Sequence, residues 1–425
     1  MLPEGWRQCR MGDLFESRRE RGRPGLPLLS VTMNDGLVDR EDLDRKQDSA
    51  LTPEEHLLVK PGDIAYNMMR MWQGAFGLAD REGMVSPAYV VLKPKATADS
   101  AYLAQVLRAP RLRYLLRAYS YGLTDDRLRL YFDDFASIPV AMPSLNEQRR
   151  LAELLEVWDE AIGATEQLLT NRRALKSALA EKLLLQPMAE SRECGQVSPR
   201  DSIWQRKTLG EVARVTSGGT PDRAEPSYWG GEIPWVTTGE IQFNTIRSTA
   251  ERITESGLRQ SSAKLFPPGT LLMAMYGQGK TRGQVAKLGI HAATNQACAA
   301  VLLLDGYDPD FYFHYLSAQY EAVRALGNAG TQQNLNAGIL KGLPVPVPPA
   351  AEQQLIVRVL NCLDQAIQIT VARIQLLRAE KRALLADVLG GKRRLEDAAL
   401  TRQQSAVVRG PEGGRAGSAV QPEGR

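Results

Sequence analysis

Two kinds of polar loop hold the side chains in this sequence whose types and spacing could recognise another molecule. The first kind follows a predicted strand and occupies residues 67–73 in the first half of the chain and 276–282 in the second. Arginine and lysine can bind phosphate or pair with guanine, and glutamine can pair with adenine through two hydrogen bonds. These loops supply candidate contacts to DNA at Arg70, Trp72, Gln73, Tyr276, Gln278, Lys280 and Arg282.

The second kind of loop follows a predicted helix. Residues 119–127 combine tyrosine, aspartate and arginine, whereas residues 331–336 carry four amide side chains within six positions. Amides offer both donors and acceptors to base edges, although a solvated surface loop is an alternative explanation of the same composition. The candidate contacts from these loops are Tyr121, Arg127, Thr331, Gln332, Gln333 and Asn334.

The sequence contains no complete motif for nucleotide binding, metal binding or catalysis. Residues 277–281 resemble the end of a phosphate-binding P-loop, but the full pattern requires a glycine at the position of Ala274. The three histidines are isolated from one another, so we expect no metal site and no histidine-based catalytic triad. Paired carboxylates such as Asp125 and Asp126 are more typical of solvated loop charge than of a nuclease site.

The composition is that of a globular protein of the reducing cytoplasm. A length of 425 residues suggests two or three domains, and 43% apolar with 24% charged residues excludes a disordered or collagen-like chain. The four cysteines show no paired spacing, which argues against disulfides and a zinc site. We find no run of 18 apolar residues and no signal peptide, so we expect no membrane association. The net charge of +4 permits an acidic partner without requiring one.

An internal repeat organises the chain. Residues 138–148 reappear as residues 343–353, an offset of 205, and the match continues without a gap through the helical segments that follow. At this offset Asp159 corresponds to Asp364 and Lys176 to Lys381. A weaker repeat comes earlier, where a glycine, an acidic and an aliphatic residue recur at residues 12–14 and 210–212. The repeat predicts two copies of one module, each a globular part followed by a long helix.

The two repeated segments predict long helices that pair in a coiled coil. Apolar positions alternate at intervals of four and three residues through both segments, which is the spacing of a coiled-coil seam. About 40 residues at 1.5 Å each span about 60 Å, longer than a small domain needs. A core helix of a bundle is the alternative interpretation. The predicted seam residues are Leu155, Trp158, Ile162, Thr165, Leu360, Leu363, Ile367 and Thr370.

The sequence predicts that the globular part of each copy is an α+β domain. The predicted strands are residues 28–31, 64–68 and 85–92 in the first copy and 233–236, 270–275 and 297–304 in the second. One helix is predicted in each copy, over residues 100–117 and 311–326. Each copy therefore combines strands and a helix with irregular polar loops.

The combination of these features resembles the specificity subunit of type I restriction-modification systems. Its most specific part is the doubled element in which a proline-rich segment is followed by Glu-Gln, at 147–148 and 352–353, and then by a long helix. Residues 216–221, 233–236 and 294–296, with Gly330-Thr331, strengthen the resemblance in the second copy. The resemblance covers about residues 1–390. The first copy departs more, because it has Ser-Pro-Ala at 86–88 and lacks the amide-rich stretch.

The resemblance implies an α+β fold with two tandem target-recognition domains, separated by two long antiparallel coiled-coil helices with pseudo-twofold symmetry. Each domain would read one half of a bipartite, asymmetric site in double-stranded DNA. The corresponding segments would be target-recognition domain 1 (1–145), spacer helix 1 (146–187), a linker (188–202), target-recognition domain 2 (203–349), spacer helix 2 (350–390) and a disordered tail (391–425).

The resemblance also implies that this chain is not an enzyme by itself and holds no metal. The helices would dock DNA methyltransferase subunits, two of them, and motor-nuclease subunits would join for restriction. The methyl donor, ATP and Mg²⁺ would belong to those partners. Two other functions stay open from the residues alone: a scaffold that assembles proteins without binding DNA, and a nuclease with an unrecognised site.

Overall fold

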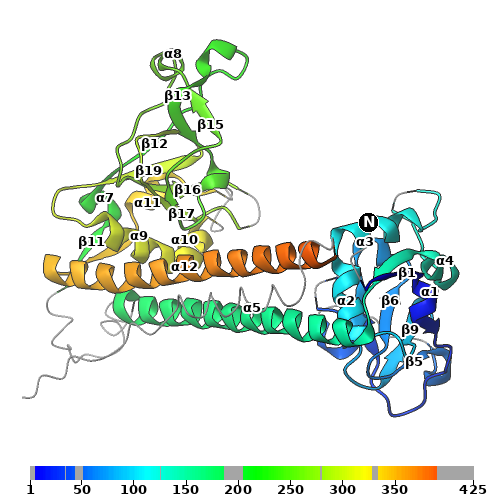
Figure 1. Cartoon of the computed structure of the whole chain (residues 1–425). Helices are drawn as coiled ribbons and strands as arrows, with labels where there is room; N and C mark the ends of the chain where they lie inside the picture. Colours follow the sequence, from blue (N-terminus) through cyan, green and yellow to red (C-terminus); the bar gives the residue numbers. More distant parts are fainter. Residues whose placement is uncertain are drawn as a thin grey trace, which may run out of the picture. The chain divides into compact units, whose positions relative to one another are not determined.

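The structure of the chain is a computed structural model, which describes residues 5–33, 35–43, 51–124, 126–185, 204–277, 280–327 and 334–389 (Figure 1). The chain divides into two compact units. Unit 1 takes residues 1–165 together with residues from 373 onward, and unit 2 takes residues 166–372. The predicted linker at 188–202 and the predicted tail at 391–425 lie outside the described residues.

A four-stranded antiparallel sheet forms the centre of unit 1. Its order is β2 (Phe15–Ser17), β9 (Tyr89–Pro94), β6 (Ile64–Asn67) and β7 (Phe76–Leu78). Three strand pairs accompany it: β1 (Arg7–Arg10) with β10 (Pro139–Met142), β3 (Leu29–Val31) with β4 (Leu37–Asp39), and β5 (Leu57–Val59) with β8 (Gly83–Val85). The helical elements are α1 (Met11–Leu14), η1 (Arg40–Asp42), η2 (Pro53–Glu55), η3 (Met71–Gln73), α2 (Ser100–Arg108), α3 (Pro110–Ala118) and α4 (Phe132–Ser137).

Two predicted elements of unit 1 are interrupted. The helix predicted over residues 100–117 is divided into α2 and α3, because Ala109 precedes Pro110 and adopts an extended conformation with φ −64° and ψ 143°. The strand predicted over residues 85–92 is divided into β8 and β9. Between them the Tyr89 N–H donates to the Ser86 carbonyl at 2.9 Å, which makes a turn around Pro87.

Unit 2 is built around a five-stranded sheet in the order β12 (Ala213–Ser217), β19 (Cys298–Leu303), β16 (Leu271–Ala274), β17 (Val285–Leu288) and β14 (Thr245–Ile246). A three-stranded sheet, β15 (Glu251–Ile253), β13 (Trp229–Val236) and β18 (Ala293–Thr294), and the pair β11 (Gln205–Thr208) with β20 (Pro344–Val347) complete the strands. The helical elements are α7 (Leu209–Val212), η5 (Pro226–Tyr228), η6 (Thr238–Glu240), α8 (Glu255–Arg259), α9 (Pro309–Ala318), α10 (Tyr320–Leu326) and α11 (Ala337–Lys341). The single helix predicted over residues 311–326 is divided at Gln319.

The two units repeat the same strand order. The order β2-β9-β6-β7 in unit 1 matches β12-β19-β16-β17 in unit 2, where β14 adds a fifth strand. The weak repeat at residues 12–14 and 210–212 now has a structural reason. Gly12 and Gly210 allow a close approach, because a Cβ atom on them would lie 3.0 Å from Ala136 Cβ and 3.2 Å from Lys341 Cβ. The acidic residue caps a short helix, and the aliphatic residue is buried.

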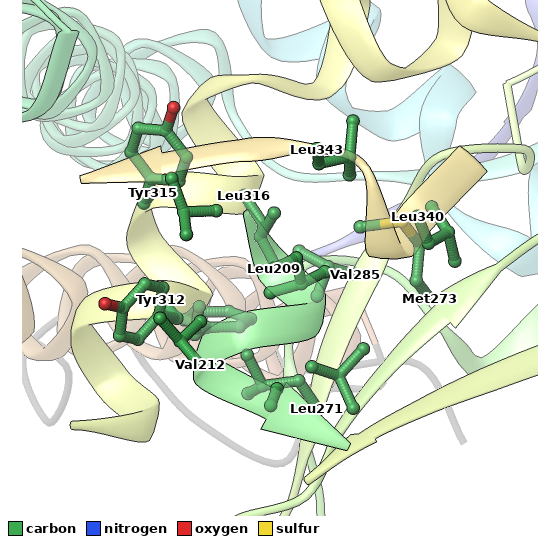
Figure 2. Packing of buried hydrophobic residues seen from close by; sticks show 14 of the residues in the cluster. Leu209, Val212, Leu271, Met273, Val285, Tyr312, Tyr315, Leu316, Leu340 and Leu343 are labelled. Carbon is green, nitrogen blue, oxygen red and sulfur yellow. The ribbon is translucent and has the colours of Figure 1, made fainter. Parts of the chain in front are cut away.

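The main core of unit 2 lies between its sheet and its helices. Figure 2 shows Leu209 and Val212 of α7, with Leu271, Met273 and Val285 of the sheet, in one apolar cluster. Further side chains from α9, α11 and the segment before β20 complete the cluster: Tyr312, Tyr315, Leu316, Leu340 and Leu343. The C-terminal part of the first long helix joins this cluster through the buried Leu184, so the helix is anchored in the unit.

The two long helices are α5 (Leu145–Ala180), followed by a π-helical turn η4 (Glu181–Leu185), and α12 (Ala350–Leu389) (Figure 1). In unit 1 the amine of Lys381 lies 2.5 Å from Asp159, and in unit 2 the amine of Lys176 lies 2.5 Å from Asp364. Arg172, four residues before Lys176, donates to the Ala366 carbonyl at 2.9 Å, so contacts move back along α12 as they move forward along α5, and the helices run antiparallel in unit 2. The predicted seam residues are buried or half-buried: Leu155, Trp158, Ile162, Thr165, Leu360, Leu363, Ile367 and Thr370.

A buried glutamine explains the repeated Glu-Gln element. Gln353 donates through Nε2 to the Pro348 carbonyl at 2.8 Å and accepts from the Asp308 N–H at 3.2 Å through Oε1. Gln148 repeats this in unit 1, where it donates to the Pro143 carbonyl at 3.1 Å and accepts from the Asp99 N–H at 2.9 Å. Each glutamine therefore joins the start of a long helix to the N-cap of a helix in the globular part.

Helix α12 is long and apolar enough, by length and composition alone, to cross a membrane. The search for 18 uninterrupted apolar residues misses this helix, because charged residues interrupt its apolar run. Only 22% of its most apolar window is buried within the structure. Asp364 lies within the helix and forms an ion pair with Lys176, and one face forms the coiled-coil seam, so packing against α5 accounts for part of this apolar character.

Candidate nucleic-acid interface

In unit 1 the two kinds of polar loop meet at the end of strand β6. The N–H of Leu130, which closes the second loop, donates to the carbonyl of Met68 in the first loop at 3.0 Å. The buried hydroxyl of Tyr66 donates to the Leu130 carbonyl at 3.2 Å, although the two residues are 64 positions apart. These bonds place both loops at the same edge of the sheet.

The same arrangement recurs in unit 2. The N–H of Leu335, 205 residues after Leu130, donates to the carbonyl of Met275 at 3.1 Å. Met275 directly follows β16, which is the counterpart of β6 in the repeated strand order. One main-chain hydrogen bond therefore brings the two loops together in each unit.

The first loop of unit 1 holds its candidate residues in a short helical turn packed against α3. The exposed Arg70 donates through Nη1 to the Gln73 side chain at 3.2 Å. Trp72 donates through Nε1 to the Met69 carbonyl at 3.1 Å, and the Arg117 guanidinium carbon lies 5.4 Å from the centre of the indole. This stacking keeps a second cation beside the loop.

The second loop of unit 1 forms a short finger. Tyr121 and Arg129 exchange main-chain hydrogen bonds of 2.9 and 2.8 Å, which close the base of the finger. Tyr121 is 62% exposed, Arg127 is exposed, and Leu123 is 97% exposed. The finger thus offers aromatic, cationic and apolar groups to a partner.

In unit 2 the first loop is held by helix α10. The hydroxyl of Tyr320 donates to the Lys280 carbonyl at 2.6 Å and accepts from Arg324 Nη1 at 3.0 Å. The side chains of Lys280 and Tyr276 are exposed, whereas Arg282 is half-buried. Lys280 is consequently the candidate cation of this loop that is best placed for an external phosphate.

Several predicted contacts of unit 2 fall outside the described residues: Gln278, Thr331, Gln332 and Gln333. Asn334, the last of the predicted amides, is described and exposed. It directly precedes Leu335, whose main-chain bond ends this loop at Met275.

The glycine-rich motif at residues 216–221 has a packing role. A Cβ atom on Gly218 would lie 2.0 Å from the Thr294 carbonyl oxygen, and one on Gly219 would lie 2.3 Å from the Ser262 carbonyl carbon. The buried Trp235 donates through Nε1 to the Gly219 carbonyl at 3.1 Å. Residues of all three motif segments in the second copy therefore meet in one packed junction.

Arg223, next to this junction, is used inside the unit. Its guanidinium donates to both carboxylate oxygens of Glu251, at 2.7 and 2.8 Å, and lies 3.8 Å from the centre of the Trp229 ring. The hydrogen bonds from Arg223 lower the pKa of the Glu251 carboxyl group and keep it ionised. This arginine therefore makes an internal ion pair.

Within the residues that the structure describes, no three histidine, cysteine or acidic side chains are grouped so that they could hold a metal ion. The isolated histidines have neighbours of other kinds. His314 Nε2 lies 2.8 Å from Asn361 Oδ1, and His56 Nδ1 lies 2.8 Å from the Thr52 carbonyl oxygen.

Comparisons with known proteins find similarity to specificity subunits of type I restriction-modification systems. Residues 202–379 match the family described as the type I restriction modification DNA specificity domain. The type I restriction enzyme MjaIX specificity subunit of Methanocaldococcus jannaschii is 28% identical over 175 residues, which are 40% of this chain and 39% of that protein. The MjaVIII specificity subunit of the same organism is 20% identical over 426 residues, 93% of this chain and 95% of that protein.

A solved structure shares the fold. The type I restriction-modification S subunit from M. genitalium is 15% identical, with a TM-score of 0.58 that covers 92% of this chain and 98% of that one. Residues 202–379 carry the type I restriction modification DNA specificity domain, and the chain as a whole is similar to type I restriction-modification specificity subunits. The alignment with the MjaIX subunit spans less than two thirds of that relative's own length.

The sequence analysis of this chain overlooked the residues that support the loops. Tyr320 and Arg324 hold the Lys280 loop, and Arg117 stacks on Trp72, but none of the three was selected as a site residue. The signal for the first two was available, because they stand four residues apart on a predicted helix and so share a face. No pattern in the sequence indicated that this helix bonds a loop 40 residues earlier.

Proposed function

We propose that the chain is the DNA-binding specificity subunit of a type I restriction-modification complex. Each unit serves as a target-recognition domain and reads one half of a bipartite, asymmetric site in double-stranded DNA. The observation that carries this proposal is the repeated bond between Leu130 and Met68 in unit 1 and between Leu335 and Met275 in unit 2. In each unit this bond joins the end of one polar loop to the start of the other, and two such junctions suit two half-sites.

The chemistry of the loops supports DNA as the ligand. Exposed Arg70, Arg127 and Lys280 can neutralise phosphates, and exposed Asn334 offers a donor and an acceptor to a base edge. Aromatic residues stand among these cations, as Trp72 does beside Arg117. Phosphate contacts position a protein on DNA and base contacts select the sequence, so a reading surface needs both kinds of side chain.

A gel-shift titration of the full chain against salt tests the proposal. DNA binding that uses several phosphate contacts weakens steeply with salt, with a slope that reports the number of contacts. Sequencing of methylated bases in cells that produce the chain with its methyltransferase subunits would then show a split site with two defined halves. Salt-independent binding, or no binding, would favour a protein-assembly scaffold instead.

The long helices carry a second apolar stripe that supports docking of partner subunits. The spacing of four and three continues beyond the predicted seam residues through Leu169, Lys176, Ile356 and Leu377. Among the described side chains of α5 and α12, every large apolar one that is more than 36% exposed stands one residue before a position of this pattern. These residues are Val157, Leu168 and Leu175 on α5 and Leu355, Val359, Ile369 and Leu376 on α12. Ile369, for example, is 67% exposed and precedes the buried Thr370.

We infer that these stripes bind DNA methyltransferase subunits. A stripe that keeps the spacing of four and three along a helix is the pattern that another helix can pack against. Both helices carry exposed apolar residues at the position before the seam, so two methyltransferase subunits could dock, one on each helix. Motor-nuclease subunits would join this assembly in the cytoplasm. The methyl donor, ATP and Mg²⁺ would be bound by these partners, and the chain alone would neither methylate nor cleave DNA.

Co-purification tests the docking surface. Ile369→Asp places a charge on the stripe at an exposed position, so the chain should fold normally and retain at least tenfold less methyltransferase subunit. Gln368→Asp is the matched control, because Gln368 is exposed, carries the same new charge and lies outside both the seam and the stripe. Equal retention by both variants would exclude the stripe from the interface.

A further inference from the structure

Phe243 has a backbone conformation that bulky residues rarely adopt. Its φ angle is +54°, and it is the one non-glycine residue with positive φ in the part of the chain that the structure describes. This left-handed conformation costs free energy in any residue with a large side chain, whereas glycine and asparagine tolerate it. Such strain persists where the surrounding structure enforces it, and it gathers at functional sites.

The residues on both sides enforce the conformation of Phe243. Its N–H donates to the Val285 carbonyl at 2.9 Å, where β17 begins directly after the Lys280 loop. The next residue, Asn244, accepts from the Gln242 N–H through Oδ1 at 2.9 Å and from the Lys287 N–H through its carbonyl at 2.9 Å. These bonds clamp the turn to the edge of the five-stranded sheet.

The clamp presents the phenyl ring beside the candidate interface. The ring lies 5.2 Å from the ring of Tyr320, with an interplanar angle of 89°, in an edge-to-face contact. Tyr320 is the residue whose hydroxyl donates to the Lys280 carbonyl. Phe243 is nevertheless 38% exposed, so the core of the unit does not account for its ring.

We propose that Phe243 is a specificity-determining residue that contacts the methyl group of a thymine in the half-site read by unit 2. The ring offers no hydrogen bond, and it lies next to a loop whose exposed cation, Lys280, suits phosphate. The thymine methyl group is the apolar feature of a base edge in the major groove, and phenylalanine is one of the side chains that contact it. This assignment rests on the proposed function, because it requires unit 2 to bind DNA.

The test combines a change in the protein with a change in the DNA. Once the target is known, each thymine of the second half-site is replaced by uracil, which lacks the methyl group, and binding of the full chain is measured. We expect the unmodified chain to lose about tenfold in affinity at one position. Phe243→Asn should lose about tenfold on thymine DNA and nothing more on the uracil DNA. Phe243→Leu should keep part of the response.

Thermal unfolding separates a contact with DNA from a structural role. Asparagine tolerates positive φ, so Phe243→Asn should unfold at the same temperature as the unmodified chain or higher. Leu304→Asn is the matched control: Leu304 is 48% exposed and follows β19, whose register places it at the opposite end of the sheet from the loop after β16. This variant should bind DNA normally.

The outcomes distinguish this proposal from the proposed function. If the chain binds both half-sites and no uracil position weakens binding, or if Phe243→Asn binds as the unmodified chain does, the assignment of Phe243 is wrong and the DNA-binding function stands. A lower unfolding temperature together with weaker binding would make Phe243 a structural anchor. If the chain shows no specific DNA binding at all, both proposals fail.

Discussion

Lys381 Nζ lies 2.5 Å from Asp159 Oδ1, and the same ion pair recurs with the helices exchanged, because Lys176 Nζ lies 2.5 Å from Asp364 Oδ1. Each pair joins one residue from each copy of the repeat. In unit 1 the amide of Gln105 completes the pair: it accepts from Lys381 at 3.0 Å and donates to Asp159 at 2.9 Å. The repeat in the sequence thus becomes a reciprocal contact in the structure.

Reversing the charges of the unit 1 pair should reveal its contribution. Lys381→Asp or Asp159→Lys alone would bring like charges together and lower the free energy of unfolding by about 1 kcal/mol, the upper range for a partly exposed pair. The double variant should recover most of this loss, because the Gln105 amide can turn to serve either arrangement. Urea denaturation of the four proteins measures the coupling. If the double variant loses as much free energy of unfolding as the two single variants together, the two side chains do not interact.

The pairing of the long helices was predictable because two independent patterns agreed. The offset of 205 residues set the correspondence between the copies, and the spacing of four and three set the seam. Neither pattern indicated the exchange of partners between Lys176 and Lys381, since charged residues on a helix give no sign of what they face. The breaks at Pro110 and Pro87 were readable from local rules, and the break at Gln319 was not.

The buried glutamines should be among the most sensitive polar residues of the chain. Gln353→Leu keeps the volume of the side chain but leaves the Asp308 N–H and the Pro348 carbonyl without their partner. We expect the free energy of unfolding to fall by about 2 kcal/mol, the cost of unsatisfied buried groups.

Gln148→Leu should cost at least as much, because Gln148 also donates to the Thr97 carbonyl at 3.1 Å. Gln167→Leu is the control, because this glutamine is exposed on α5 and its side chain bonds the nearby Asn171. Its loss should change the free energy of unfolding by less than about 0.5 kcal/mol. Chemical denaturation measures all three. Equal effects at Gln353 and Gln167 would show that the buried amide does not hold the junction.

His314 should make unit 2 sensitive to acid. Burial lowers the pKa of this histidine below its ordinary value of 6.5, against the opposing effect of its hydrogen bond to Asn361 and of nearby Asp364 and Asp310, whereas the charge of Lys176 lowers it further. The unfolded chain therefore binds the proton first. Stability is complete above about pH 6.5 and falls as the pH decreases from there toward the lowered pKa of the folded state.

The comparison of His314→Gln with the unmodified chain isolates this effect, because other titrating groups contribute equally to both. Urea midpoints at pH 7.5 and pH 5.5 should differ less in the variant. Gln105 stands at the equivalent position of unit 1, six residues after the N-cap Asp99 as His314 is six after Asp308, and an amide does not titrate, so the acid response should belong to unit 2. The same pH dependence in both proteins would assign the response to other groups.

The loops of the candidate site were predictable from the sequence, but the fact that they lie together was not. The residue types at 67–73 and 276–282 indicated side chains suited to DNA. The bonds from Leu130 to Met68 and from Leu335 to Met275 join segments that are far apart in the sequence, and no local sequence pattern predicts such contacts. The conformation of Phe243 was equally hidden, because a phenylalanine gives no signal for positive φ. An aromatic residue that looks like a core component, such as Phe243, thus becomes a candidate for the site only once the sheet is assembled.

Lengthening both long helices should change the distance between the two half-sites. Helix α5 runs from unit 1 into unit 2, and α12 runs from unit 2 into unit 1, with the divisions at residues 165–166 and 372–373. Seven residues inserted after Leu168 and seven after Ala372 keep the seam in register and leave both lysine–aspartate pairs intact. At 1.5 Å per residue the helices grow by about 10 Å, or about three base pairs at 3.4 Å each.

We expect the two half-sites to stay the same and the unread gap to lengthen by up to three base pairs, as measured by sequencing methylated bases in cells that carry the lengthened chain. Three base pairs also rotate the second half-site by about 100°, which twisting of the DNA or the partner subunits must absorb. An insertion of seven residues in α5 alone is the control: it shifts the seam of one helix against the other and should abolish the complex. An active complex that keeps the original gap would show that α5 and α12 do not set the spacing.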